Sequence, residues 1–337
     1  MGAGDAAMIW AWIGFLVFIL VLLALDLGVF NKTAHAPSMK EALLFTGGVM
    51  VLALLFTAAV WVSYHNQWLG LGNHVDAVDR LPNDGRLAAV KFLTGYVIEL
   101  SLSMDNVFVI ALIFAHLRIP VYLQHRVLFW GILGALAMRG AMIGVGAALV
   151  ARYHWVLYLF GAFLVYTGMR MLFTTGEEDA PGETWIMRQV RRFFPITEEF
   201  HGARFTLMLN GRRWLTPLAV ALVLVETTDL IFAVDSIPAI FAITADPFLV
   251  FTSNVFAILC LRSLYFGLAG LIGRFKYLKV SLSVVLTLVG AKMLAAKWLG
   301  SVLGENVNFW MLGLVAGILL VGAVVSTARS TARVSER

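Results

Sequence analysis

Two short acidic runs inside long hydrophobic segments hold the residues of this chain best suited to do chemistry. Together they supply oxygen donors from Glu99, Asp105, Asn106, Glu226, Asp229, Asp235 and Ser236. A carboxylate at membrane depth is costly unless protein, water or a cation surrounds it, so its presence indicates a functional site. Neither run contains Cys or His, and all-oxygen ligand sets suit Mn²⁺, Ca²⁺ or Mg²⁺ better than Zn²⁺ or copper. The two runs therefore predict a divalent-cation site.

Two arginines inside hydrophobic segments offer a second interpretation of the same carboxylates. Arg139 and Arg262 could form ion pairs with them and hold the helices together. Five carboxylates facing two arginines leave excess negative charge, which protons or a metal ion would have to neutralise. We therefore treat both arginines as supporting ion pairs beside a cation site, while a purely structural set of ion pairs stays open.

The spacing within the runs constrains the local backbone. Residues six apart on an unbroken helix differ by about 9 Å along the axis and about 120° around it, so Glu99 and Asp105 would point in different directions. Ser101 and Ser103 can hydrogen-bond to backbone groups, and Pro238 removes a backbone donor in the second run. We therefore expect broken helices whose freed carbonyl groups add ligands.

The composition is that of a polytopic membrane protein. Of 337 residues, 61% are hydrophobic and 13% charged, and the mean hydropathy is +0.87. Apolar stretches of about twenty residues recur, and the alternation of a β-barrel is absent. We predict an all-α fold with spans at 7–30, 41–64, 87–115, 122–150, 154–174, 214–244, 248–271, 278–299 and 309–327.

Charge distribution predicts the orientation in the lipid bilayer. Most of the 25 Lys and Arg residues fall in connections on one side of the nine-span arrangement. The positive-inside rule then places the N-terminus outside and the C-terminus in the cytoplasm. The net charge of +5 reports this topology, so we expect no nucleic-acid partner.

The acidic runs also define an internal repeat. Aligning Asp105 with Asp235 aligns Glu99 with Asp229, because both pairs are six residues apart. Further along, the segment 168–172 resembles 290–294, so that Gly168 corresponds to Gly290. Each unit has three spans, an odd number, so the second copy enters the membrane from the opposite side. Such inverted repeats place transporter substrates near the bilayer midplane.

This repeat sets the predicted organisation of the chain. Its parts are two N-terminal spans with an outer loop (1–85), a first three-helix repeat (86–174), a cytoplasmic connection (175–213), a second three-helix repeat (214–300) and a last span with a cytoplasmic tail (301–337).

Some ionisable residues lie outside the two runs. Asp26, near the inner end of the first span, has two open interpretations, an interfacial carboxylate that caps the following turn and a residue of the ion pathway. Lys292 lies toward the end of a span, where we expect it to extend to the membrane surface. No His-Glu-x-x-His or Gly-x-Ser-x-Gly motif occurs, so we expect neither an enzyme nor a prosthetic group.

The motifs resemble a known family. The segments 96–106, 125–131 and 225–239 look like the TerC family, particularly its Alx-like branch, in a match over roughly residues 10 to 325. This resemblance implies a bacterial inner-membrane protein of the LysE-like transporter group, linked to tellurium resistance and, for Alx-like members, to manganese export. It also implies that the acidic residues of the two runs bind the ion.

The expected function is thus Mn²⁺ export by alternating access, with proton exchange as a candidate coupling. The alternative is a membrane scaffold or metal-delivery partner for other proteins, in a tellurium-resistance type of role without transport of its own. That alternative would act through the connection 175–213.

Overall fold

In the described part of the chain, long helices and one short hairpin make up the fold. The computed structural model describes residues 3–25, 39–73, 75–173, 187–188, 192, 194–197, 199–209, 211–268, 276–296, 298–299 and 306–335. The long helices there are α1 (Ala3–Leu25), α2 (Met39–His65), α3 (Gly85–His116), α4 (Val121–Arg152), α5 (Trp155–Phe173), α7 (Pro217–Phe241), α8 (Pro247–Leu268), α9 (Lys276–Leu294) and α11 (Val307–Ser335).

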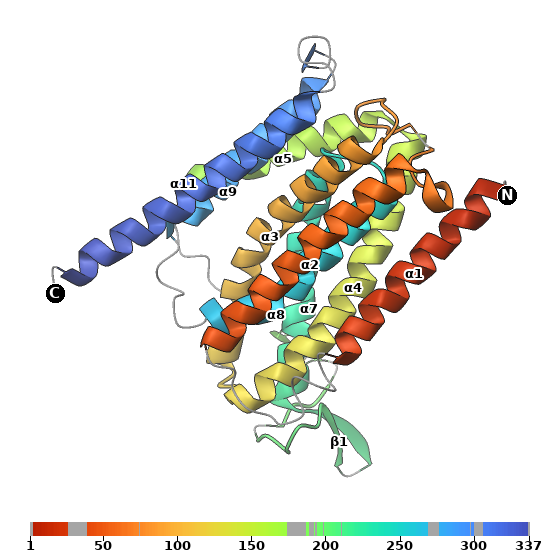
Figure 1. The fold of residues 1–337 in the computed structure, drawn as a ribbon. Coiled ribbons are helices and arrows are strands. Elements are labelled where there is room, and N and C mark those ends of the chain that lie inside the picture. Colours follow the sequence, from red (N-terminus) through yellow and green to blue (C-terminus); the bar gives the residue numbers. More distant parts are fainter. Residues whose placement is uncertain are drawn as a thin grey trace.

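These nine helices of the described residues correspond to the nine predicted spans, so the predicted all-α fold class is confirmed. Eight of them are long and apolar enough to cross a membrane, while the apolar part of α9, Val280–Leu294, is shorter. The strands β1 (Thr206–Leu209) and β2 (Arg212–Leu215) pair antiparallel within the connection before α7. In Figure 1 this hairpin lies at one end of the helix bundle.

Local sequence signals set several helix starts. The carboxylate of Asp84 accepts a hydrogen bond from the backbone N–H of Leu87 at 2.7 Å and caps α3. Pro217 and Pro247 are the first residues of α7 and α8. The backbone N–H that proline lacks would have no partner within the helix at this position.

The expected breaks in the two acidic runs are wrong, because α3 and α7 continue unbroken through them. The hydroxyl of Ser101 donates to the carbonyl of Val97 at 2.8 Å, one turn earlier, and so leaves the helix ladder intact. Pro238 lies in the last turn of α7, where it removes one hydrogen bond without ending the helix.

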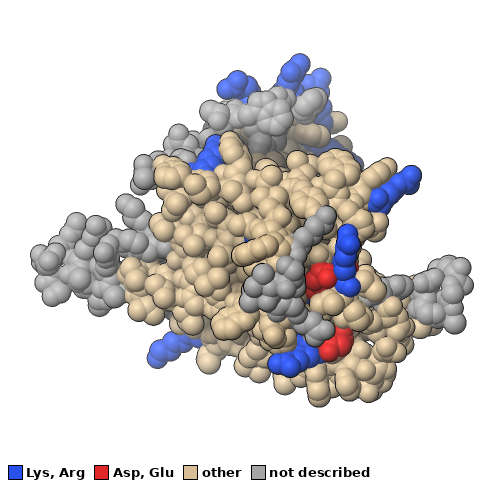
Figure 2. All heavy atoms as spheres, turned by 90° about the horizontal axis from the view of Figure 1, so that it is seen from above, with Lys and Arg blue, Asp and Glu red and all other residues tan. Residues whose placement is uncertain are grey.

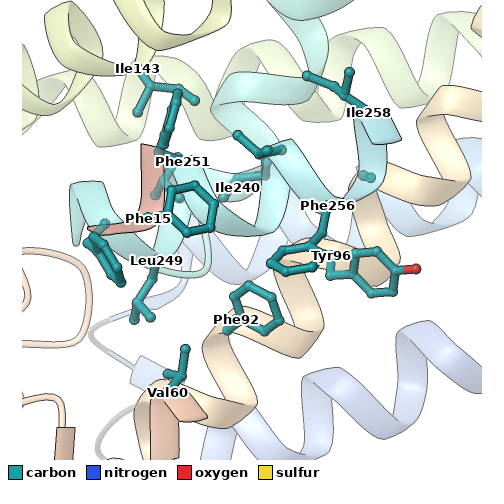
Figure 3. Close-up of a cluster of buried hydrophobic side chains, with 14 of the residues drawn as sticks. Phe15, Val60, Phe92, Tyr96, Ile143, Ile240, Leu249, Phe251, Phe256 and Ile258 are labelled. Atoms are coloured by element: carbon teal, nitrogen blue, oxygen red, sulfur yellow. The ribbon is translucent and has the colours of Figure 1, made fainter. Parts of the chain in front are cut away.

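Helix α8 lies at the centre of the bundle, and 94% of its membrane-length window is buried. Its Phe256 packs against Phe56 of α2 at 4.9 Å between ring centroids and against Phe92 of α3 at 5.9 Å. Phe15 of α1 joins this cluster, and Figure 3 shows the rings of Phe15, Phe92 and Phe256 with Tyr96 and Ile240 close by. The apolar core thus packs α3 against α8, and α3 also packs against α7.

Helices α5 and α9 cross at glycines. A Cβ atom at Gly290 would lie 2.7 Å from the carbonyl oxygen of Gly161, and one at Gly168 would lie 2.8 Å from that of Ser283. If Gly168 corresponds to Gly290, then Gly161 corresponds to Ser283, so the two contacts are equivalent. The contacts agree with an inverted repeat, and the repeat itself stays a prediction, as does the domain division built on it.

We expect Gly290→Ala to lower the thermal unfolding temperature in detergent, because overpacking a close helix crossing costs about 1–3 kcal/mol. The matched control is Gly144→Ala in α4, where an added Cβ meets no atom within 4 Å. The control should be neutral or stabilising, by up to about 1 kcal/mol. Equal melting of the two variants would contradict the close crossing.

Candidate functional site

One arginine joins the two acidic runs. Nε and Nη2 of Arg139 in α4 donate to the two carboxylate oxygens of Asp229 in α7, at 3.0 and 2.8 Å. Its Nη1 donates to the carboxylate of Glu99 in α3 and to Oδ1 of Asn254 in α8, the latter at 3.2 Å. Arg139 is 1% exposed and Glu99 is fully buried. Side chains from four helices therefore meet on one guanidinium.

Several buried oxygen atoms of α3 and α7 have no hydrogen-bond partner. Asn106 donates through Nδ2 to Asp229 at 3.3 Å, yet its Oδ1 accepts no hydrogen bond. The unpartnered oxygens of α3 and α7 in the described residues are Glu99 Oε2, Ser103 Oγ, Asn106 Oδ1, Glu226 Oε2, Thr228 Oγ1 and Ser236 Oγ. An unsatisfied buried polar atom costs about 1–3 kcal/mol. Such a concentration on two adjacent helices is unusual in a folded protein, and each of these atoms calls for an explanation.

Glu226 depends on a glycine of the neighbouring helix. It precedes Asp229 by three residues and so shares its face of α7. A Cβ atom at Gly134 of α4 would overlap the Glu226 carboxylate, so only glycine leaves room for that group in its place. Gly134 could not be recognised from the sequence, since a glycine in an apolar helix carries no sign of what lies against it.

The remaining predicted site residues are placed less centrally or lie outside the described part. Asp105 in α3 and Asp235 in α7 are half-buried. Among the described residues, no group of three or more His, Cys, Asp or Glu side chains is arranged to hold a metal ion. Asp26 and the side chain of Arg262 lie outside the described residues. The structure thus brings Glu99, Asn106 and Asp229 together, while the full ligand set stays a prediction.

A second buried ionic centre lies at the end of the bundle opposite the hairpin. Lys91 of α3 donates to Asp76 at 2.8 Å and to Asn83 Oδ1 at 2.7 Å, and pairs with Asp79 at 2.8 Å. Burial works to raise the pKa of Asp76, but the charge and hydrogen bonds of Lys91, with a hydrogen bond from Thr244, lower it below its usual value. The connection 66–84 is therefore held tightly against the helices.

The same centre reaches the connection between α7 and α8. Burial raises the pKa of Asp246, which accepts hydrogen bonds from the hydroxyl of Tyr64 at 2.9 Å and from Asn83 Nδ2 at 3.2 Å. The backbone N–H of Ala245 donates to Asp76 at 3.0 Å. These bonds place the α2–α3 and α7–α8 connections at the same end, as the nine-span order requires. Figure 2, which views the molecule from above, shows few acidic atoms on that surface.

Lys292 of α9 also belongs to this end of the molecule. It is 6% exposed, and its Nζ donates to the carbonyl of Ala242 at 2.8 Å and to Asn308 Oδ1 at 3.5 Å. Nδ2 of Asn308 in turn donates to Asp79 at 3.0 Å. The expectation that Lys292 extends to the membrane surface is therefore wrong. Near the end of a span, the protein itself supplies acceptors that outweigh hydration of the ammonium group.

We expect Lys91→Met to destabilise the protein strongly, by about 3–5 kcal/mol, because it leaves the buried Asp76 and the half-buried Asp79 without this cation. Unfolding in detergent measures the effect, with Lys40→Met as control, since Lys40 of α2 is exposed. Adding Asp76→Asn to Lys91→Met should recover part of the loss. If Lys91→Met melted like the control, the ionic centre would not be holding the connection.

Comparison with known proteins adds the family context. The sequence profile of the integral membrane protein TerC family matches residues 85–334. The chain is 47% identical to the membrane protein STKORF319 of Myxococcus xanthus over 319 residues, which cover 95% of this chain and 92% of that protein. It is 42% identical to Alx of Escherichia coli (strain K12), named as a candidate membrane-bound redox modulator, over 316 residues that cover 94% and 93%. No solved structure matches.

Proposed function

Because this chain belongs to the TerC family of integral membrane proteins, we propose that it exports divalent cations, with Mn²⁺ as the substrate, across the bacterial inner membrane. The chain is a multi-pass membrane protein. The observation that carries the proposal is the set of unpartnered buried oxygens on α3 and α7, the two helices whose carboxylates Arg139 holds. In the proposed orientation the N-terminus is outside and the C-terminus in the cytoplasm.

Charge balance supports a cation as substrate. The carboxylates of Glu99, Glu226 and Asp229 lie on α3 and α7, and Arg139 supplies one positive charge to this region. A buried carboxylate without compensation is unfavourable, so a further cation at this site would stabilise it. The donors are carboxylate, amide and hydroxyl oxygens, which suit hard divalent cations.

Each predicted residue has a defined role in this proposal. Four carboxylates hold the ion as the charged ligands, and three further side chains complete or support its shell. The charged set is Glu99, Asp105, Asp229 and Asp235, and the supporting set is Asn106, Glu226 and Ser236.

The name of the Escherichia coli relative suggests a redox role as a second candidate. Cys260 is the single cysteine of the chain and is buried, with its Sγ 3.5 Å from the hydroxyl of Tyr96. One cysteine cannot form a disulfide within the chain, so dithiol chemistry would need a thiol from another molecule. A redox effect of this protein is better explained through metal supply. The scaffold alternative, acting through 175–213, stays a prediction.

Metal flux in proteoliposomes tests the proposal directly. Wild-type protein should transport Mn²⁺, and Asp105→Asn and Asp235→Asn should each lower the flux at least about tenfold, equivalent to about 1.4 kcal/mol. Parallel assays with Ca²⁺, Mg²⁺ and Zn²⁺, with and without a pH gradient, define the selectivity and the coupling. The control is Asp84→Asn, because Asn also caps helix α3 and Asp84 is exposed.

Normal flux in both acidic variants would exclude their role as ligands. Absence of flux in wild-type protein, together with loss of cellular function on deletion of 175–213, would favour the scaffold alternative.

We expect Gly134→Ala to impair transport although Gly134 is not a ligand, because the added methyl group displaces the Glu226 carboxylate. The carboxylate is the far end of a flexible side chain, so stability should change by less than about 1.5 kcal/mol. Gly144→Ala in the same helix is the matched control. The measurement is Mn²⁺ flux beside the melting temperature. Full flux in Gly134→Ala would remove Glu226 from the site.

A further inference from the structure

We propose that Arg139 is a resident counter-ion that competes with the transported cation for Glu99 and Asp229. The inference rests on the proposed function and adds a regulatory element to the same site. The guanidinium holds both carboxylates in the present conformation, so binding of a cation to them requires it to move.

The hydrogen bonds show which ligand atoms the arginine occupies. Oδ2 of Asp229 accepts from Nε of Arg139, and Oδ1 accepts both from Nη2 of Arg139 and from Asn106. Oε1 of Glu99 accepts from Nη1, whereas Oε2 has no partner. Both carboxylate oxygens of Asp229 and one of Glu99 thus already accept hydrogen bonds from the guanidinium. The unpartnered oxygens of α3 and α7 belong mostly to neutral groups.

Arginine cannot make room for a cation by losing its charge. Its guanidinium stays protonated in proteins, so a divalent cation next to it would be repelled. The guanidinium must therefore leave at least one of the two carboxylates when the cation arrives.

This competition would link cation binding to helix movement. Arg139 ties α4 to α3, α7 and α8 through Glu99, Asp229 and Asn254. A cation that displaces the guanidinium breaks at least one of these ties and itself bridges α3 and α7. Cation binding therefore weakens the polar ties between α4 and its neighbours, while the packing of α4 on α7 and α8 remains.

The test is Mn²⁺ binding to purified protein in detergent, measured by calorimetry and by the rise in melting temperature that Mn²⁺ produces. Arg139→Gln removes the competitor and should bind Mn²⁺ at least tenfold more tightly than wild type. Asn254→Ala keeps the arginine but removes one of its acceptors, so it should tighten binding two- to fivefold. The matched control, Ser253→Ala, should bind as wild type does, since the Ser253 hydroxyl bonds to Val250 of its own helix.

Unchanged or weaker binding in both variants would overturn the inference and leave an arginine that only supports the fold. If Arg139→Gln does not fold, Asn254→Ala carries the test alone. Absence of Mn²⁺ binding in wild type and in every variant would instead refute the proposed function, and the inference with it.

Discussion

The buried ion pairs of Arg139 are the interaction on which the centre of this protein depends. One guanidinium compensates carboxylates from α3 and α7 and holds an amide of α8. Removing one partner of a buried ion pair leaves a charge without compensation, which typically costs about 3–5 kcal/mol. The apolar core around Phe256 brings the helices together, and the arginine then determines how α4 sits against the other three.

The second ionic centre shows what a purely structural cluster looks like in the same molecule. Lys91, like Arg139, is a buried cation that contacts two carboxylates and one asparagine oxygen. Around Lys91, Asp76 and Asp246 accept hydrogen bonds from neighbouring backbone N–H groups and hydroxyls. On α3 and α7, whose carboxylates bind Arg139, the oxygens of Ser103, Asn106 and Ser236 are buried without partners. This difference favours a ligand at the first centre and a structural role for the second.

Sequence patterns predicted the helices because the length and apolarity of a span depend on local composition. They also predicted that both acidic runs belong together, because the carboxylate spacing recurs. They failed where the outcome depends on a distant neighbour. Ser101 was expected to interrupt α3, but its hydroxyl hydrogen-bonds to the carbonyl of Val97 in the same helix. Lys292 is buried because Ala242 and Asn308 supply hydrogen-bond acceptors. The role of Gly134 follows only from the position of Glu226 on another helix.

The continuity of α3 and α7 changes how the acidic runs could act together. Glu99 and Asp105 differ by about 120° around an unbroken helix, so no local unwinding turns both toward one point in this conformation. Asp105 and Asp235 are half-buried, and they can join Glu99 and Asp229 at one ion only if whole helices slide or rotate. Such movement has to break the guanidinium contacts that tie α4 to α3 and α7. Release of Arg139 and gathering of the carboxylates are therefore two aspects of a single rearrangement.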